Sequence, residues 1–136
     1  MWLTNAILCM LFMGAMALAM KKVTLYGIPY TWILMFTFLL GAVFFLIHSL
    51  SIRSALHLTS QSAMWILCIA VFSYAGNLFG LRSIASAPNP GYTMAIMGCS
   101  SIIVLLGSVA FFDAQLSLTS IAGVILCVAG VVLLAI

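Results

Sequence analysis

Five long runs of apolar residues constrain the fold of this chain more than any other feature. They cover roughly residues 2–20, 30–48, 63–81, 91–112 and 119–136. Each is close to the roughly 20 residues that a helix needs to cross a bilayer. Barrel strands are about half this length and alternate apolar with polar residues. The sequence therefore predicts an all-α, polytopic membrane protein, with five transmembrane helices in a single domain over residues 1–136.

The composition excludes other environments for the folded chain. Apolar residues make up 67% of the sequence and charged residues only 4%, whereas soluble domains carry about 25% charged residues. A soluble fold would have almost nothing to place against water. Four basic residues and one acidic residue also cannot form a nucleic-acid surface. The lipid bilayer is therefore the expected partner, and nucleic acid is not.

The basic residues predict an orientation in the membrane. Lys21, Lys22 and Arg82 lie in the first and third loops, and Arg53 lies in the second. Because cytoplasmic loops carry an excess of Lys and Arg, we expect the N-terminus outside and the C-terminus in the cytoplasm. The expected location is a cell membrane, a bacterial inner membrane in particular. The excess is small, so insertion in both directions stays open. Cleavage of the first run as a signal peptide is disfavoured, since its charges follow it.

The residues that commonly carry enzyme or metal chemistry are scattered along the chain. Each of Cys9, Cys68, Cys99 and Cys127 lies in a different apolar run, as expected for small packing residues. The two histidines, His48 and His57, offer too few ligands for a metal. We therefore expect no enzymatic activity, no cofactor and no metal site.

Polar and aromatic residues inside the third and fourth runs are the candidate substrate-binding residues. They are Ser73, Tyr74, Asn77, Tyr92, Thr93 and Met97. Pro88 and Pro90 interrupt helix between the two runs, so a sharp turn is expected to bring these residues together. Such a pocket suits a neutral, zwitterionic or amphiphilic metabolite, or a cation held by aromatic rings. The alternative is that Asn77 only bonds a neighbouring helix.

Two glycines in the last run, Gly123 and Gly130, lie two turns apart on one helix face. Small residues allow helices to approach closely in lipid. The spacing predicts a homodimer interface, and packing within the chain is the alternative.

Two stretches, "APNPGYTMAI" and "VAFFDAQLSLTSIAGVILCVAGVVLLAI", resemble the C-terminal part of an EamA-like repeat of the drug/metabolite transporter superfamily. The matching positions are Ala87, Pro88, Asp113, Gly123, Gly130 and Val131. Usual members have two inverted five-helix repeats, and this chain resembles one. The resemblance implies a transporter of a small metabolite or amphiphilic compound. It would work by alternating access as a homodimer, parallel or antiparallel, or with a similar half-transporter.

A more distant similarity links the chain to the small multidrug resistance proteins. Their first helix holds a membrane-embedded Glu, and Met13 takes that position here, which adds Met13 to the candidate substrate-binding residues. The family's acidic residue after the fourth helix is Asp113 here, expected to cap the last helix or to pair with a basic loop residue. A non-transporting membrane subunit or scaffold, assembled through small-residue packing, is the alternative function.

Overall fold

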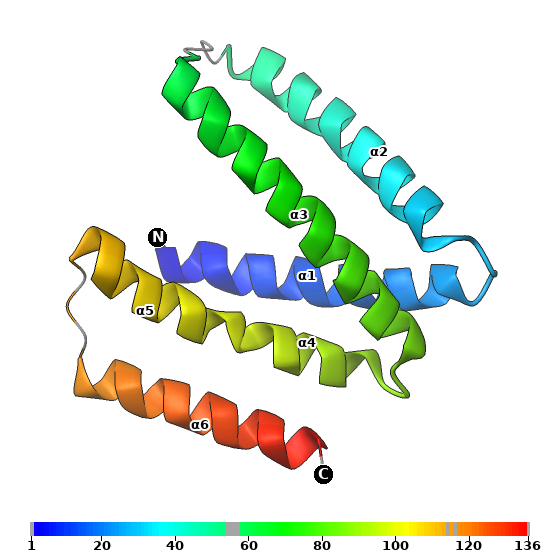
Figure 1. Cartoon of the computed structure of the whole chain (residues 1–136). Helices are drawn as coiled ribbons and strands as arrows, with labels where there is room; N and C mark the ends of the chain where they lie inside the picture. The colour runs from blue at the N-terminus through cyan, green and yellow to red at the C-terminus, as the bar shows by residue number, and fades with distance from the viewer. Residues whose placement is uncertain (1, 54–57, 114, 116, 136) are drawn as a thin grey trace. The chain divides into compact units, whose positions relative to one another are not determined.

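The chain is all-helical in the part that the computed structural model describes, which is residues 2–53, 58–113, 115 and 117–135 (Figure 1). Its helices are α1 (Trp2–Thr24), α2 (Tyr30–Ser51), α3 (Ser60–Ser86), α4 (Pro90–Gly98), α5 (Ser100–Phe112) and α6 (Leu118–Ala135). Four segments are long and apolar enough to cross a membrane, with α4 and α5 counted together, and α6 contributes a shorter apolar helix. The predicted all-α fold is confirmed, and the single domain stays a prediction.

The fourth apolar run, predicted as one helix, is interrupted at Cys99. The Cys99 N–H donates to the Ile96 carbonyl at 3.0 Å, and the Ile102 N–H donates to the Cys99 carbonyl at 3.0 Å. Bonds that reach three residues back belong to a tighter helical turn than the α-helix. Gly98 and Ser100 flank this turn, and such residues are common where helices bend. The fourth span is therefore built as α4 and α5 in series.

Polar side chains mark the starts of α3 and α4. The Ser62 N–H donates to the Thr59 hydroxyl at 3.2 Å, and the Thr59 N–H donates to the Ser62 hydroxyl at 2.9 Å. This reciprocal pair is a capping box. At α4, the Asn89 side-chain oxygen accepts from the Gly91 N–H at 2.8 Å, and Pro90 takes the first helical position. Proline is favoured there because that position needs no N–H, so the prolines act as predicted.

Ser117 caps the start of α6, whereas Asp113 lies at the end of α5. The Ser117 hydroxyl accepts from the Ser120 N–H at 3.1 Å. Asp113 instead ends α5, with a left-handed φ of 50°. The expectation that Asp113 caps the last helix is therefore replaced by a serine cap, because Ser117 lies directly before the first helical residue.

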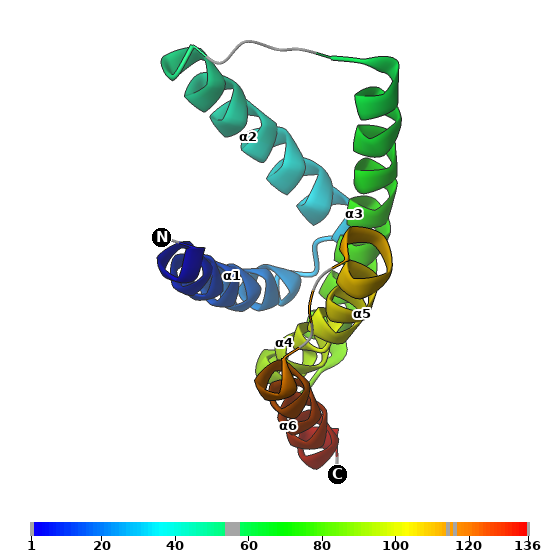
Figure 2. The same ribbon diagram turned by 90° about the vertical axis from the view of Figure 1, so that its left-hand side faces the viewer.

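The described helices belong to two compact units. Residues 1–18 and 86–136 form one unit, and residues 19–85 form the other. In the first, α4 packs beside α6 (Figures 1 and 2). In the second, α2 and α3 lie closest where α2 begins and spread apart toward its other end (Figure 2).

The second unit is joined where α1 ends, α2 begins and α3 ends. Its buried apolar side chains, Met20, Ile33, Leu34, Leu81 and Ile84, come from these three segments. The Lys21 ammonium donates to the Ala85 carbonyl at 2.7 Å. A lysine is favourable at the carbonyl end of a helix. The basic ends of α1 and α3 therefore lie together, as expected for loops on the same side of a membrane.

The five-helix topology predicts that the loops before and after α3 face opposite sides of the membrane. In a background with the four native cysteines replaced by alanine, single cysteines at Ser60 and Ala87 should give complementary labelling. A membrane-impermeant maleimide added outside should label a fraction at Ser60 equal to the fraction protected at Ala87, even if the chain inserts both ways.

Leu25→Cys serves as the control: it lies in the loop after α1, leaves the basic residues unchanged, and should match Ala87→Cys. Equal labelling of Ser60→Cys and Ala87→Cys in a one-way inserted population would contradict a membrane-spanning α3.

Candidate functional site

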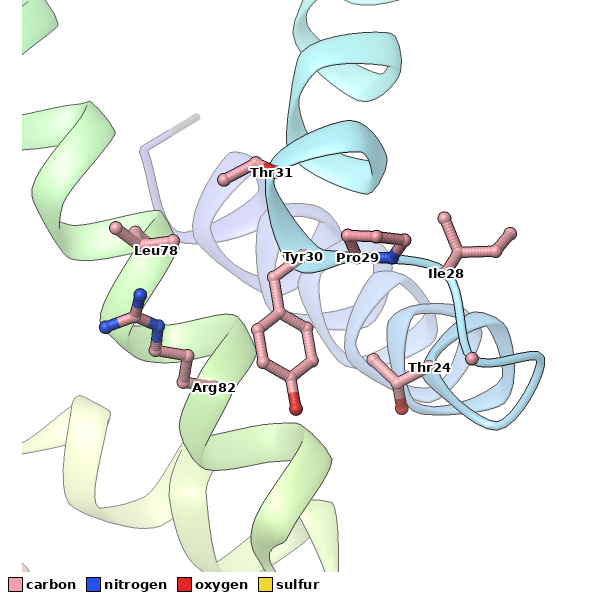
Figure 3. A pocket seen from close by; sticks show the side chains of 8 residues that line it. Thr24, Ile28, Pro29, Tyr30, Thr31, Leu78 and Arg82 are labelled. Carbon is pink, nitrogen blue, oxygen red and sulfur yellow. The ribbon is translucent and has the colours of Figure 1, made fainter.

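A cavity of about 400 Å³ lies at the joined end of the second unit. Figure 3 shows its lining, with Leu78 and Arg82 projecting from α3 and Tyr30 standing across from them. The lining residues are Thr24, Gly27, Ile28, Pro29, Tyr30, Thr31, Leu78 and Arg82. One guanidinium and three hydroxyl-bearing side chains therefore surround an otherwise apolar space.

The loop between α1 and α2 shapes one wall of this cavity. Gly27 has a φ of +73°, a left-handed conformation that glycine adopts without a steric penalty. Pro29 follows as the N-cap of α2, and its carbonyl accepts from the N–H groups of Trp32 and Ile33 at 3.0 and 3.2 Å. The turn therefore places Tyr30 in the first turn of α2, facing the cavity.

Arg82 forms the charged part of the opposite wall. Its guanidinium carbon lies 6.0 Å from the centre of the Phe79 ring, within the range of a cation–π contact. Leu78 lies one helical turn before Arg82 on the same face of α3. This face carries an apolar side chain directly beside the charge.

Two further cavities continue from the first between α2 and α3. The second, about 250 Å³, is lined by Thr31, Leu34, Met35, Phe38, Tyr74 and Leu78. The third, about 240 Å³, is lined by Phe38, Ala70, Ser73 and Tyr74. Neighbouring cavities share residues: Thr31 and Leu78 line the first and second, and Phe38 and Tyr74 line the second and third. We call the three together the α2/α3 groove.

Two of the predicted substrate-binding residues, Ser73 and Tyr74, line this groove. Asn77 has a different environment. Its amide nitrogen donates to the Ser73 carbonyl at 2.8 Å and lies 3.4 Å from the Ser73 hydroxyl. These contacts stay within α3, so they are not the interhelical bond that the alternative interpretation required.

The other four predicted substrate-binding residues belong to the first unit. Thr93 is buried, with 4% of its surface exposed, whereas Met13, Tyr92 and Met97 are each about two-fifths exposed. Their contribution to a binding site stays a prediction.

Gly130 lines a separate cavity of about 330 Å³ between α4 and α6, in the first unit. The other lining residues are Ala95, Gly98, Cys99, Cys127 and Val131. A Cβ built on Gly123 or Gly130 meets no atom within 4 Å. Gly130 thus faces α4 of its own chain with space to spare, and the dimer contact stays a prediction.

The sequence interpretation missed the α2 side of the groove, formed by Thr31, Leu34, Met35 and Phe38. The only local signal is Thr31, a hydroxyl placed two residues after Pro29 in an otherwise apolar segment.

His57 lies outside the described residues. Within the part of the chain that is described, no three His, Cys, Asp or Glu side chains gather as a metal site.

Several long apolar helices, joined by short polar segments, define a multi-pass membrane protein. A sequence profile described as the EamA-like transporter family matches residues 1–136. The chain therefore belongs to the EamA-like transporter family, which is a family of membrane transporters and not of enzymes. No curated protein and no solved structure gives a significant match to the chain.

The groove predicts where thiol reagents should reach inside α3. In the cysteine-free background, Leu78→Cys should react with a water-soluble methanethiosulfonate about tenfold faster than Phe72→Cys. The thiolate is the reactive form, and a thiol in contact with lipid is held protonated. Leu78 lines the groove, whereas Phe72 is 75% exposed on another face of α3. Equal rates would mean that the groove excludes water as fully as the lipid-facing surface does.

Proposed function

We propose that the chain is half of a membrane transporter and that it carries a small amphiphilic solute along the α2/α3 groove. The observation that carries this proposal is the series of three cavities, which runs from Arg82 at one end to Ala70. A ligand site typically has an apolar lining with a few polar groups that fix orientation. The groove has this character, and membership of a transporter family makes transport the natural use for it.

The groove is too open to work alone. Tyr74 is 62% exposed, and Met35 and Phe38 are each 46% exposed, although all three line it. A transporter must shield its site from one side of the membrane at a time, which inverted repeats achieve by presenting two related gates. We therefore propose that a second copy, parallel or antiparallel, or a similar half-transporter completes the site. Met13, Tyr92, Thr93 and Met97 are the residues that we expect to contribute further lining.

The proposed orientation places the end that carries Lys21, Lys22 and Arg82 in the cytoplasm. The hydrogen bond from Lys21 to Ala85 supports a common side for these basic residues. Lys and Arg favour the cytoplasmic side of the bilayer. A bacterial inner membrane fits this orientation, with the N-terminus outside.

Replacing Tyr74 should reduce transport without unfolding the chain. Purified protein in liposomes should move an NBD-labelled hexyl chain bearing a phosphate, phosphocholine or trimethylammonium head group across the bilayer. Dithionite quenching would report the rate. We expect Tyr74→Leu to lower the rate of any transported probe by about tenfold, the loss of roughly one aromatic contact.

Phe72→Leu is the matched control and should keep the full rate, since Phe72 lies outside the groove lining. Asn77→Leu should also preserve the fold, because it removes a bond made within α3. Wild-type protein that moves none of the three probes above the rate of protein-free liposomes would contradict the proposal and favour a non-transporting subunit.

The proposed homodimer contact through α6 can be tested at Gly123 and Gly130. Replacing both with leucine should convert dimers to monomers, because the added bulk prevents close approach of two backbones. Native mass spectrometry of the protein in neutral detergent would measure the ratio. Gly130→Ala should keep the fold, since its Cβ meets no atom within 4 Å in the chain, and should stay dimeric because a methyl group adds far less bulk than leucine. Gly14→Leu, on α1, provides the size-matched control, and a fully dimeric double variant would place the interface elsewhere.

A further inference from the structure

The lining of the α2/α3 groove changes character along its length. At one end, the 400 Å³ cavity has the Arg82 guanidinium together with the hydroxyls of Thr24, Tyr30 and Thr31. Beyond Leu78, the lining is mostly aliphatic and aromatic, with the Ser73 hydroxyl and the Tyr74 phenol as its polar groups. A polar, charged end that continues into an apolar channel matches a ligand that is itself divided into a head group and a chain.

The charged end of the groove belongs to a unit whose charged side chains are all basic. Residues 19–85 contain Lys21, Lys22, Arg53 and Arg82 and no aspartate or glutamate. Lys21 and Arg82 belong to the same joined helix ends, where the Lys21 ammonium reaches Ala85 at 2.7 Å. A basic side chain such as Arg82 favours an anion over a cation beside it. Arginine also offers a planar set of N–H donors suited to phosphate or carboxylate.

Beyond the charged end, the groove offers few polar groups to a ligand. The Asn77 amide bonds the Ser73 carbonyl of its own helix, and the Thr37 hydroxyl bonds the Ile33 carbonyl of its own helix at 2.7 Å. Met35, Phe38 and Tyr74 instead provide the surface of the second cavity. A fully polar solute would lose its hydration there without compensation, whereas an apolar chain would not.

The length and depth of the groove fit one leaflet of a bilayer. Arg82 and Ala70 are twelve residues apart on α3, which corresponds to about 18 Å along a helix. Half of a hydrocarbon core measures about 15 Å. Tyr26, Tyr30 and Trp32 lie near the charged end, and such aromatic residues favour the membrane interface. An anion held by Arg82 would therefore sit at head-group depth, with its chain reaching toward the middle of the bilayer.

We infer that the solute class of this groove is an amphiphilic anion, with a phosphate or carboxylate head at Arg82 and an apolar chain between α2 and α3. The inference rests on the proposed transport path and narrows its substrate. It also disfavours a cationic ligand, which the aromatic residues alone would allow. A cation in this groove would lie near the positive charge of Arg82. The head and chain could belong to a membrane lipid or to a free amphiphile.

Binding to the full-length protein in phosphatidylcholine nanodiscs tests this inference separately from transport. Thermal unfolding, followed through the tryptophan fluorescence, should shift upward and saturably with dodecyl phosphate, since a ligand stabilises the state that binds it. Inorganic phosphate and dodecyltrimethylammonium at equal concentrations should give no such shift. The first lacks the chain and the second carries the opposite charge.

The Arg82→Gln variant should lower the affinity for dodecyl phosphate at least about tenfold, because a hydrogen bond to a charged group is lost. Arg82→Lys should restore part of that affinity. Arg53→Gln is the matched control: it removes the same charge from the loop after α2 and should bind like wild type. Far-UV circular dichroism would confirm that each variant is folded. Equal affinity of wild type and Arg82→Gln, or equal binding of dodecyltrimethylammonium, would overturn the inference.

A competition experiment separates the two sources of the anion. If the natural ligand is a lipid, phosphatidylglycerol in the nanodisc should displace dodecyl phosphate from the wild type in an Arg82-dependent way. If the ligand is a free amphiphile, phosphatidylglycerol should leave binding unchanged. Both results support an amphiphilic anion. Anion binding without flux would contradict the proposed transport alone, whereas flux without anion selectivity would contradict this inference alone.

Discussion

The cost of an unpaired peptide group in hydrocarbon is the constraint on which the rest of this structure depends. Each such group costs several kcal/mol, so a chain that is 67% apolar must satisfy its backbone within helices. Polar side chains are then needed where helices begin and end. Thr59 and Ser62 cap α3, Asn89 caps α4, and Ser117 caps α6. These four polar side chains therefore serve the backbone groups at helix starts.

Two of the basic residues, Lys21 and Arg82, lie where the ends of α1 and α3 meet. Lys21 closes the end of α3 through the Ala85 carbonyl, and Arg82 borders the cavity that opens beside it. A charged side chain in lipid surroundings is costly and usually functional. An arginine beside a continuous apolar groove is therefore a candidate ligand-binding residue. The proposed amphiphilic anion would match this arrangement, with its head at Arg82 and its apolar chain along the groove.

In the first unit, α4 and α6 pack through small residues and not through charged helix ends. Its α4 and α6 meet through small residues, including Gly98 and Gly130, and leave a cavity between them. In lipid, such contacts depend on close approach and not on a hydrophobic drive. The break at Cys99 lies beside this cavity. Among the helices that the structure describes, the interrupted span formed by α4 and α5 therefore packs against α6 through α4.

The sequence by itself determined the five helical runs, the prolines that separate α3 from α4, and the common location of Lys21, Lys22 and Arg82. These features can be predicted because they depend only on the length of each apolar run, the backbone restrictions of proline and the order of the loops. The sequence also identified Ser73 and Tyr74 as candidate lining residues, because they are polar or aromatic residues in an apolar helix. Only the tertiary structure decided that Phe38 and Thr31 of α2 line the same groove, and that Asn77 bonds its own helix. Helices that are apolar on all sides carry little periodic signal, so which face meets which neighbour is set by packing between distant segments.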